Sequence, residues 1–147
     1  RRLPGDDLLA AYPEMLDSVQ AFPLCGYLAG SIDAVLRYAG PEFVIVDYKT
    51  NKIFSGPVDA SQFDQQAMAS EMMRSHYPLQ ALLYSVALHR YLRWRLPSYS
   101  PHSNLGGVQY LFVRAMIGPD TPRGCGVFNW RPSAELVIEL SDLLAGL

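Results

Sequence analysis

Residues 44–51 read VIVDYKTN and place a carboxylate and an ammonium two residues apart at the end of an apolar run. The segment from Val44 to Val46 is typical of a buried strand, and Asp47 and Lys49 then project to the same face of that strand. A charge that is buried without a partner is costly, so both charges need a physical reason. The pattern alone leaves two interpretations open, a surface ion pair and a reactive site that uses both groups.

The composition draws attention to the lysine. Of the 12 Lys and Arg residues, only Lys49 and Lys52 are lysine. Lysine is a compact point charge with a pKa that its surroundings can tune, whereas arginine is a delocalised cation that stays charged. A sequence that otherwise uses arginine for positive charge has therefore kept lysine at a position where it could take part in a reaction.

A second carboxylate lies on the other side of a predicted turn. The stretch AGPE at 39–42 is a turn signal between two apolar segments and predicts a hairpin. If the chain turns at Gly40, Asp33 and Asp47 are equally far from the tip and face each other. Opposed carboxylates repel unless a cation lies between them, and oxygen ligands suit a hard cation such as Mg²⁺, Mn²⁺ or Ca²⁺. Such a cation could polarise a phosphoryl oxygen and acidify a bound water.

The elements that must position these residues follow from periodicity and turn signals. We expect a short helix or turn over 7–20, interrupted by Pro13, and strands at 26–38, 43–50, 106–114 and 124–130. We expect helices over 60–76 with Ser61 as N-cap, over 77–96 with Pro78 in the first turn, and from Ser133 to about residue 145. The segment 98–104 is expected to be a loop. This order predicts a mixed α/β domain with a central sheet.

The strongest helix signal, over 77–96, predicts which side of that helix is buried. Apolar residues at spacings of three and four indicate an apolar face formed by Leu79, Leu82, Leu83, Val86 and Tyr91. At its end, HRYLRWR at 89–95 could face DNA or a partner, but a solvated helix end is the favoured interpretation, because cations are stabilised near a helix C-terminus.

Bulk properties limit the class of protein. The 147 residues, half of them hydrophobic, predict one domain over 1–147 with a poorly assigned lead-in at 1–23. No apolar run approaches the length of a transmembrane helix. The net charge of -2 does not indicate nucleic-acid binding by the domain as a whole. Cys25 and Cys125 favour a reducing compartment and core or partly buried thiols. Because the chain starts at Arg1, we expect an N-terminally truncated part of a longer protein.

Three motifs together resemble a known family. GYLAGSID at 26–33 followed by VIVDYKTN resembles the core of the PD-(D/E)xK nuclease superfamily in its RecB-like branch, where one Asp ends a G-x-x-D element and another opens D-Y-K. QALLY at 80–84 matches the Q-x-x-x-Y pattern of the same branch. The resemblance covers about residues 24–147 and is strongest to the nuclease domains of exodeoxyribonuclease V β subunits. It implies a restriction-endonuclease-like fold, in which helices flank a central mixed sheet with a catalytic β-hairpin.

The resemblance implies roles for individual residues. Asp33 and Asp47 would be metal ligands together with the backbone carbonyl of Tyr48, and Lys49 would be the catalytic lysine. Gln80 and Tyr84, one turn apart on one helix face, would contact DNA or orient the ligands, although ordinary helix packing stays possible for both. The implied metal is Mg²⁺, which Mn²⁺ or Ca²⁺ could replace in vitro.

The same resemblance implies an activity and partners. A metal-dependent exodeoxyribonuclease would hydrolyse DNA phosphodiester bonds during double-strand break processing for homologous recombination and leave 5′-phosphates. The parent chain would carry an ATP-dependent helicase, work with RecC and RecD subunits, help to load RecA, and lie in the bacterial cytoplasm without contacting a membrane.

One part of the family pattern is missing. RecB-like nucleases also use a histidine ligand from a helix well upstream of the hairpin, but the histidines here are all downstream of it, at His76, His89 and His102. Glu14 or Asp17 could replace that ligand only by coincidence. We therefore expect an incomplete metal site, weak metal binding and little activity in this chain. Two alternatives remain, a nuclease-fold interaction module that serves RecA loading or subunit docking, and a small stand-alone RecB-like nuclease.

Overall fold

The computed structural model describes residues 3–17, 19, 26, 29–38 and 40–146, in which the strands form one four-stranded mixed sheet. The order is β1 (Ala34–Arg37), β2 (Phe43–Lys49), β3 (Leu105–Phe112) and β4 (Val127–Trp130). The pairs β1–β2 and β3–β4 are antiparallel, whereas β2 and β3 are parallel. The expected mixed α/β domain with a central mixed sheet is confirmed.

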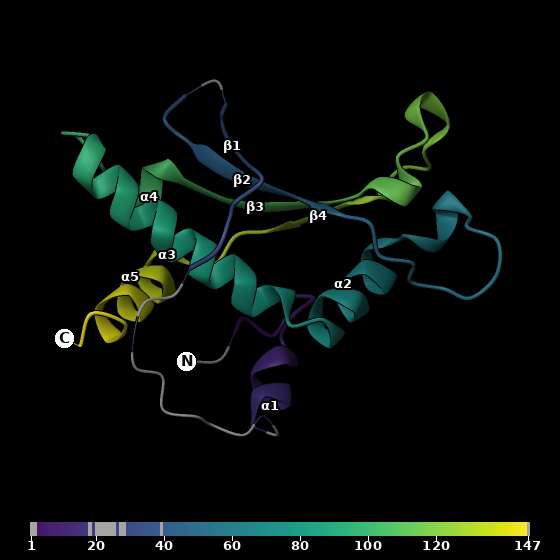
Figure 1. Cartoon of the computed structure of the whole chain (residues 1–147), viewed down its shortest axis with the longest axis horizontal. Helices are drawn as coiled ribbons and strands as arrows, with labels where there is room; N and C mark the ends of the chain where they lie inside the picture. The colour runs from purple at the N-terminus through teal and green to yellow at the C-terminus, as the bar shows by residue number, and fades with distance from the viewer. Residues whose placement is uncertain (1–2, 18, 20–25, 27–28, 39, 147) are drawn as a thin grey trace.

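The long connection between the parallel strands carries the helices that cover the sheet, since parallel neighbours need a crossover. It contains α2 (Gln65–Arg74), α3 (Tyr77–Arg95) and the short α4 (Pro101–Asn104). Before the sheet lies α1 (Tyr12–Leu16), and after it α5 (Ala134–Leu143). Figure 1 shows α2, α3 and α5 on the same side of the sheet, with α3 running beneath it.

The core lies between that face of the sheet and the helices. Each contributes large side chains that are almost completely buried, namely Ile45, Val108, Tyr110, Phe112 and Phe128 from the strands and Met68, Met72, Ala81 and Leu92 from the helices. Residues 45, 47 and 49 alternate along β2 on this same face. The polar end of β2 therefore points toward α3, and the site is built at the margin of the core.

The first strand is shorter than expected. Pairing with β2 covers only Ala34–Arg37, so the prediction of a strand over 26–38 is wrong for Gly26, for 29–33 and for Tyr38, while residues 27–28 lie outside the described part. The segment leaves the sheet because other groups take over the bonds that a strand would make. The Ser31 carbonyl accepts from the Tyr84 hydroxyl, and the Asp33 carboxylate accepts from the Tyr48 amide.

The N-cap at Ser61 was also predicted wrongly. Residues 60–62 form a separate 3-10 turn capped by Asp59, and α2 begins only at Gln65, after its N-cap Asp64. The Asp64 carboxylate accepts a hydrogen bond from the Ala67 amide. Two carboxylate caps divide the segment because the side chain of Phe63 between them is buried in the core.

The long helix matches its expected limits, but its buried face does not match. Pro78 lies in the first turn of α3, and the helix ends at Arg95. Of the five residues expected on the buried face, only Val86 is buried, whereas Leu79 and Tyr91 are exposed. The buried set includes Ala81, Ser85, Leu88, His89 and Leu92. The face was predicted wrongly because α3 packs against both the sheet and α5, which buries polar residues whose hydrogen bonds are satisfied.

The remaining elements agree with the sequence in kind. The predicted strand at 106–114 is β3, which begins at Leu105 and ends at Phe112, and the strand at 124–130 is reduced to Val127–Trp130. The expected loop at 98–104 contains the helical turn α4. Ser133 caps α5 as predicted by accepting from the Leu136 amide, and that helix ends at Leu143.

Two further sequence expectations concern the thiols and membranes. Cys125 is partly buried, as expected, while Cys25 lies outside the described residues. Among the helices that the structure describes, none combines the length and the apolar character that crossing a membrane would need.

Candidate active site

The charged end of β2 is an ion pair in the margin of the core. Asp47 is 4% exposed and Lys49 is 8% exposed, and the lysine Nζ lies 2.5 Å from the Asp47 Oδ1. The two side chains share a face because they are two residues apart on one strand. The sequence left open that Asp47 and Lys49 form an ion pair on the surface. They do form an ion pair, but it is buried.

One oxygen of Asp47 has an incomplete environment. Its Oδ1 is buried, and its contact with Lys49 lacks the geometry of a hydrogen bond, so this oxygen accepts none from the described residues. Buried acceptors in native proteins nearly always have a hydrogen-bond partner, and an oxygen that binds a metal ion does not need one. Asp47 therefore fits the role of a cation ligand by its own environment.

Asp33 lies opposite Asp47 at the mouth of the hairpin. The register pairs Ala34 with Val46, so one further step along both strands brings position 33 to position 47. The Asp33 side chain is exposed, and its Oδ2 accepts a hydrogen bond of 2.9 Å from the Tyr48 amide. The two carboxylates therefore differ, because one is buried and the other faces solvent.

The Tyr48 carbonyl lies on the same side as Asp33. In a strand, the amide and the carbonyl of one residue point toward the same neighbour, as in the pairs that exchange two hydrogen bonds in antiparallel sheets. Since the Tyr48 amide reaches Asp33, its carbonyl oxygen also points beyond the end of β1. Two carboxylates and one carbonyl form a set of hard oxygen donors that suits Mg²⁺, Mn²⁺ or Ca²⁺.

A chain of hydrogen bonds joins Lys49 to the segment that carries Asp33. Lys49 Nζ donates to Gln80 Oε1 at 2.9 Å, and Gln80 Nε2 donates to the Tyr84 hydroxyl at 3.0 Å. The Tyr84 hydroxyl donates in turn to the Ser31 carbonyl at 2.6 Å. Both residues of the Q-x-x-x-Y motif therefore belong to the site and hold its two sides together, which ordinary packing alone would not require.

Sequence comparison relates the chain to known proteins. No family model matches the chain. The chain is 53% identical to the RecBCD enzyme subunit RecB of Mycolicibacterium smegmatis over 150 residues, which is 97% of this chain and 14% of that protein. It is 51% identical to RecB of Mycobacterium tuberculosis over 97% of this chain, and 40% identical to RecB of Escherichia coli over 83% of it. The chain is homologous to a segment of RecB.

The relationship to RecB confirms the resemblance that the motifs indicated, within a limit. The chain spans 14% or less of the length of these curated relatives. The match therefore concerns one segment of a much longer protein, and what the longer protein does is transferred to this chain only as a proposal.

Tyr77 and Tyr110 surround Lys49 in this RecB homologue, and neither of them was identified from the sequence as part of the site. The Lys49 Nζ lies 3.8 Å from the centre of the Tyr77 ring and 5.1 Å from that of Tyr110, and the two rings are stacked 5.8 Å apart. Tyrosine faces attract an ammonium group, so the rings help to hold Lys49 in place. The signal for Tyr77 was its position three residues before Gln80, on the same side of α3.

The charges of the site act on the tyrosines near it. Burial raises the pKa of Tyr84, and the nearby carboxylates of Asp47 and Asp33 raise it further. The pKa of Tyr110 is also raised, mainly by burial and next by Asp47. Both hydroxyls therefore stay protonated as donors at neutral pH.

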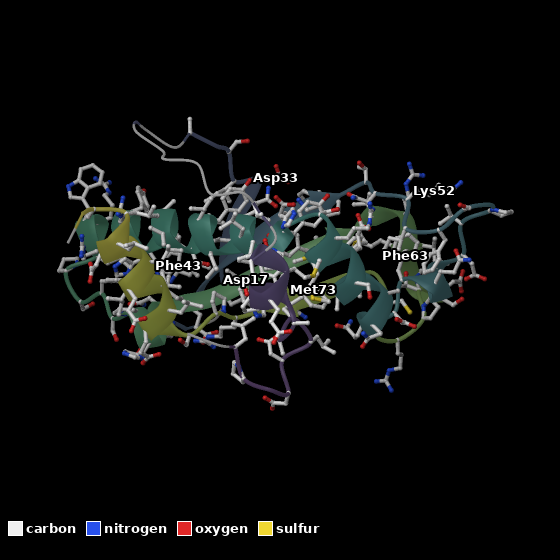
Figure 2. All side chains as sticks on the ribbon, turned by 90° about the horizontal axis from the view of Figure 1, so that it is seen from below. Asp17, Asp33, Phe43, Lys52, Phe63 and Met73 are labelled. Atoms are coloured by element: carbon white, nitrogen blue, oxygen red, sulfur yellow. The ribbon has the colours of Figure 1, made fainter. Side chains whose placement is uncertain are left out.

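The other candidate ligands form no group with the two carboxylates among the described residues, although His76 lines a cavity with Gln80 and Tyr84. His76 and His102 are exposed, and His89 is buried with its Nδ1 2.8 Å from the Tyr99 hydroxyl. Glu14 and Asp17 are exposed, and Figure 2 shows Asp17 well apart from Asp33. Over the described residues, no group of three or more His, Cys, Asp or Glu side chains could hold a metal ion.

Proposed function

We propose that this chain is a nuclease domain that hydrolyses DNA phosphodiester bonds with the help of a divalent cation. The observation that carries the proposal is the buried Asp47 oxygen that accepts no hydrogen bond from the described residues, beside Lys49 and opposite Asp33. A purely structural ion pair would not need a second carboxylate at the same end of the hairpin. The homology to RecB supports the assignment, since those relatives are subunits of the RecBCD enzyme.

The residues that would hold the cation are Asp33, Asp47 and the Tyr48 carbonyl. Mg²⁺ is the proposed ion, with Mn²⁺ or Ca²⁺ as substitutes, because Mg²⁺ is commonly bound through one or two carboxylates and keeps several waters. When bound, the ion supplies Lewis acidity toward a phosphate and toward the attacking water.

The protein supplies orientation and a fixed positive charge. Lys49 is held by Asp47, by Gln80 and by the Tyr77 ring, so its ammonium has a defined place beside the carboxylates. There it would hold the attacking water or offset charge that develops on the phosphate. The water oxygen forms a bond to phosphorus as the bond to the 3′ oxygen breaks, and that oxygen takes up a proton. The products are a 3′ hydroxyl and a 5′-phosphate.

The surrounding protein is part of the same proposal. We infer a restriction-endonuclease-like fold and a parent chain with an ATP-dependent helicase that works with RecC and RecD, helps to load RecA, and processes double-strand breaks for recombination in the bacterial cytoplasm. The name of the relatives, which makes RecB a subunit of the RecBCD enzyme, supports the first two partners.

A second candidate is an interaction module with a nuclease fold that is catalytically incomplete as it stands. The observation that favours it is the small number of ligands, since the described residues bring no third His, Cys, Asp or Glu side chain to the two carboxylates. On either proposal we expect this chain to bind metal weakly.

Cleavage and metal binding test the proposal together. Labelled linear DNA is incubated with the chain and Mg²⁺ or Mn²⁺, and Mn²⁺ binding is followed by electron paramagnetic resonance. We expect slow cleavage that EDTA stops and that Asp47→Ala and Lys49→Ala abolish, while the exposed control Arg123→Gln retains it. Cleavage that persists in both site variants would contradict the proposal. No cleavage, together with Mn²⁺ binding that Asp47→Ala leaves unchanged, would favour the interaction module.

A further inference from the structure

The last turn of α3 exposes a group of aromatic and basic side chains. Trp94 is 76% exposed and Tyr91 is 54% exposed, and their ring centres lie 6.4 Å apart in an edge-on arrangement. The Arg95 guanidinium lies 5.1 Å from the centre of the Trp94 ring. The other tryptophan, Trp130, is buried. Two large aromatic side chains exposed side by side are a feature of binding surfaces more than of solvated helix ends.

These aromatics lie on the same stripe of α3 as the residues of the site. Gln80, Tyr84, Ala87, Tyr91 and Trp94 follow each other at intervals of four, three, four and three residues, which places them on one side of the helix. Exposure increases along the stripe, from the partly buried first two residues to the exposed last three. Tyr84 and Trp94 are ten residues apart, or about 15 Å along the axis, a distance that a few nucleotides of single strand can span.

A groove lies beside the middle of this stripe. It lies between α3 and the segment 29–32, has a volume of about 300 Å³, and its lining includes Tyr84, Ala87 and Arg90. Tyr84 is shared with the candidate site, and Arg90 is one residue from Tyr91. The groove therefore occupies part of the interval between Tyr84 and the aromatic pair.

The positive charge at the C-terminal end of α3 favours binding of a polyanion. Arg93 and Arg95 are exposed, and the described residues offer neither of them a carboxylate partner. Arg90 is different, because its guanidinium donates to the Ser141 hydroxyl and carbonyl and so serves packing against α5. Two uncommitted arginines beside exposed aromatic rings can bind phosphates and stack on unpaired bases.

We propose that Tyr91, Trp94, Arg93 and Arg95 form a stacking platform for the single strand of DNA that continues from the candidate site. The proposal rests on the proposed function for the identity of the ligand. Single-stranded DNA fits better than a duplex because stacking on Trp94 requires bases that are free of a partner. It fits better than a protein because the platform continues the helix stripe that starts at Gln80 and Tyr84 in the candidate site, and because Arg93 and Arg95 complement a polyanion.

The experiment measures binding without cleavage. A labelled oligodeoxythymidylate is titrated with the chain in EDTA, and both its anisotropy and the tryptophan emission are followed. We expect the oligonucleotide to quench the emission of Trp94, and Trp94→Leu to lower the affinity about tenfold and leave only the insensitive emission of Trp130. Tyr91→Leu should also weaken binding. Because both side chains are exposed, melting curves should stay unchanged in both variants.

Two matched charge variants distinguish a local stacking platform from general electrostatic attraction between the chain and the oligonucleotide. Arg95→Gln and Arg123→Gln remove the same charge from exposed positions, and only the first lies beside Trp94. We expect Arg95→Gln to weaken binding and to lower the salt dependence by about one ion, while Arg123→Gln has little effect. Equal effects of the two, or binding that Trp94→Leu leaves unchanged, would overturn the platform. A Trp94→Leu variant that binds the oligonucleotide normally but loses binding to RecC or RecD would assign the surface to a protein instead.

The outcome is distinguishable from that of the proposed function. Since EDTA removes the metal, a chain that never cleaves DNA can still show the platform through Trp94 quenching. A chain that cleaves DNA through Asp47 while Trp94→Leu binds the oligonucleotide unchanged would uphold the nuclease and overturn the platform.

Discussion

Asp47 and Glu71 are both buried carboxylates next to a cation, but their surroundings differ. Glu71 is 2% exposed, and its two oxygens accept from the Asn51 amide, the Ser75 hydroxyl and twice from the Arg74 guanidinium. Asp47 is 4% exposed, and its Oδ1 faces the Lys49 ammonium without a hydrogen bond from the described residues. Hydrogen bonds satisfy the first carboxylate, whereas the Oδ1 of the second has an ion pair with Lys49 but no hydrogen bond from the described residues.

The two carboxylates are connected through one tyrosine. Lys49 lies on the face of the Tyr77 ring, the Tyr77 hydroxyl donates to Asn51, and the Asn51 amide donates to Glu71. The satisfied network therefore fixes the ring against which Lys49 rests. Satisfied polar networks make their surroundings rigid. Here the hydrogen bonds of Tyr77, Asn51 and Glu71 give the candidate site a rigid neighbour.

Metal binding should show the largest difference between the two carboxylates. We expect Asp47→Asn to abolish measurable Mn²⁺ binding, because it removes a charged oxygen ligand. Glu71→Gln should leave Mn²⁺ binding close to that of the unsubstituted chain, since both oxygens of Glu71 already accept hydrogen bonds. Electron paramagnetic resonance of free Mn²⁺ measures both. An equal loss of Mn²⁺ binding in the two variants would contradict the role of Asp47 as a metal ligand.

Stability should show the opposite pattern when each carboxylate is removed together with its cation. Asp47→Leu with Lys49→Met replaces the buried ion pair by apolar side chains of similar size, and we expect stability to stay level or to rise by about 1–4 kcal/mol. Glu71→Gln with Arg74→Met breaks good hydrogen bonds, and we expect a loss of about 2 kcal/mol. Urea unfolding measures both free energies. A larger loss in the Asp47 variant would show that its pair is structural.

Two Tyr→Phe substitutions on α3 should distinguish the hydrogen bonds around Asp47 from those around Glu71, with smaller effects on stability. Tyr84→Phe removes the bond to the Ser31 carbonyl, and we expect a loss of about 1 kcal/mol and faster hydrogen exchange of the Tyr48 amide, which is bonded to Asp33. Tyr77→Phe cuts only the bond to Asn51 and should leave that amide protected. Unchanged exchange in Tyr84→Phe would refute a link between the motif and Asp33.

Alkaline pH provides the smallest test. Because burial and the charges of Asp47 and Asp33 raise the pKa of Tyr84 above its ordinary value of 10.0, the folded chain holds this proton more tightly than the unfolded chain. Its contribution to stability is therefore complete below pH 10 and is lost as the pH rises through the raised pKa. We expect Tyr84→Phe to flatten the alkaline fall in unfolding free energy relative to the unsubstituted chain. An equally steep fall in the variant and the unsubstituted chain would exclude Tyr84 as a contributor.

Local signals predicted much of the fold. The apolar run before Asp47 predicted β2, the AGPE turn predicted the hairpin, and Ser133 predicted the start of α5, because strand periodicity, turn chemistry and capping depend on neighbouring residues. Predictions failed where distant groups compete with these signals. The buried face of α3 depends on two packing partners, and a local pattern cannot identify them.

The candidate site shows the same division. Asp33, Asp47, Lys49, Gln80 and Tyr84 could be chosen from the sequence because motif spacing places them on one hairpin and one helix face. Tyr110, Asn51 and Glu71 could not, since Tyr110 meets Lys49, and Asn51 meets Glu71, only after β3 and α2 pack beside β2. Contacts between residues far apart in the chain leave no periodic trace in its sequence.

By itself, the sequence determined which groups could do chemistry, because residue type and spacing along β2 put a carboxylate and an ammonium on one face of a strand. Only the tertiary structure decided that this face is buried and that the Asp47 Oδ1 accepts no hydrogen bond from the described residues beside its ion pair with Lys49. It also decided that a chain of hydrogen bonds from Lys49 to Ser31 ties the two sides of the candidate site together. Burial and hydrogen bonding depend on which surfaces meet in three dimensions, and that depends on the packing of the whole domain.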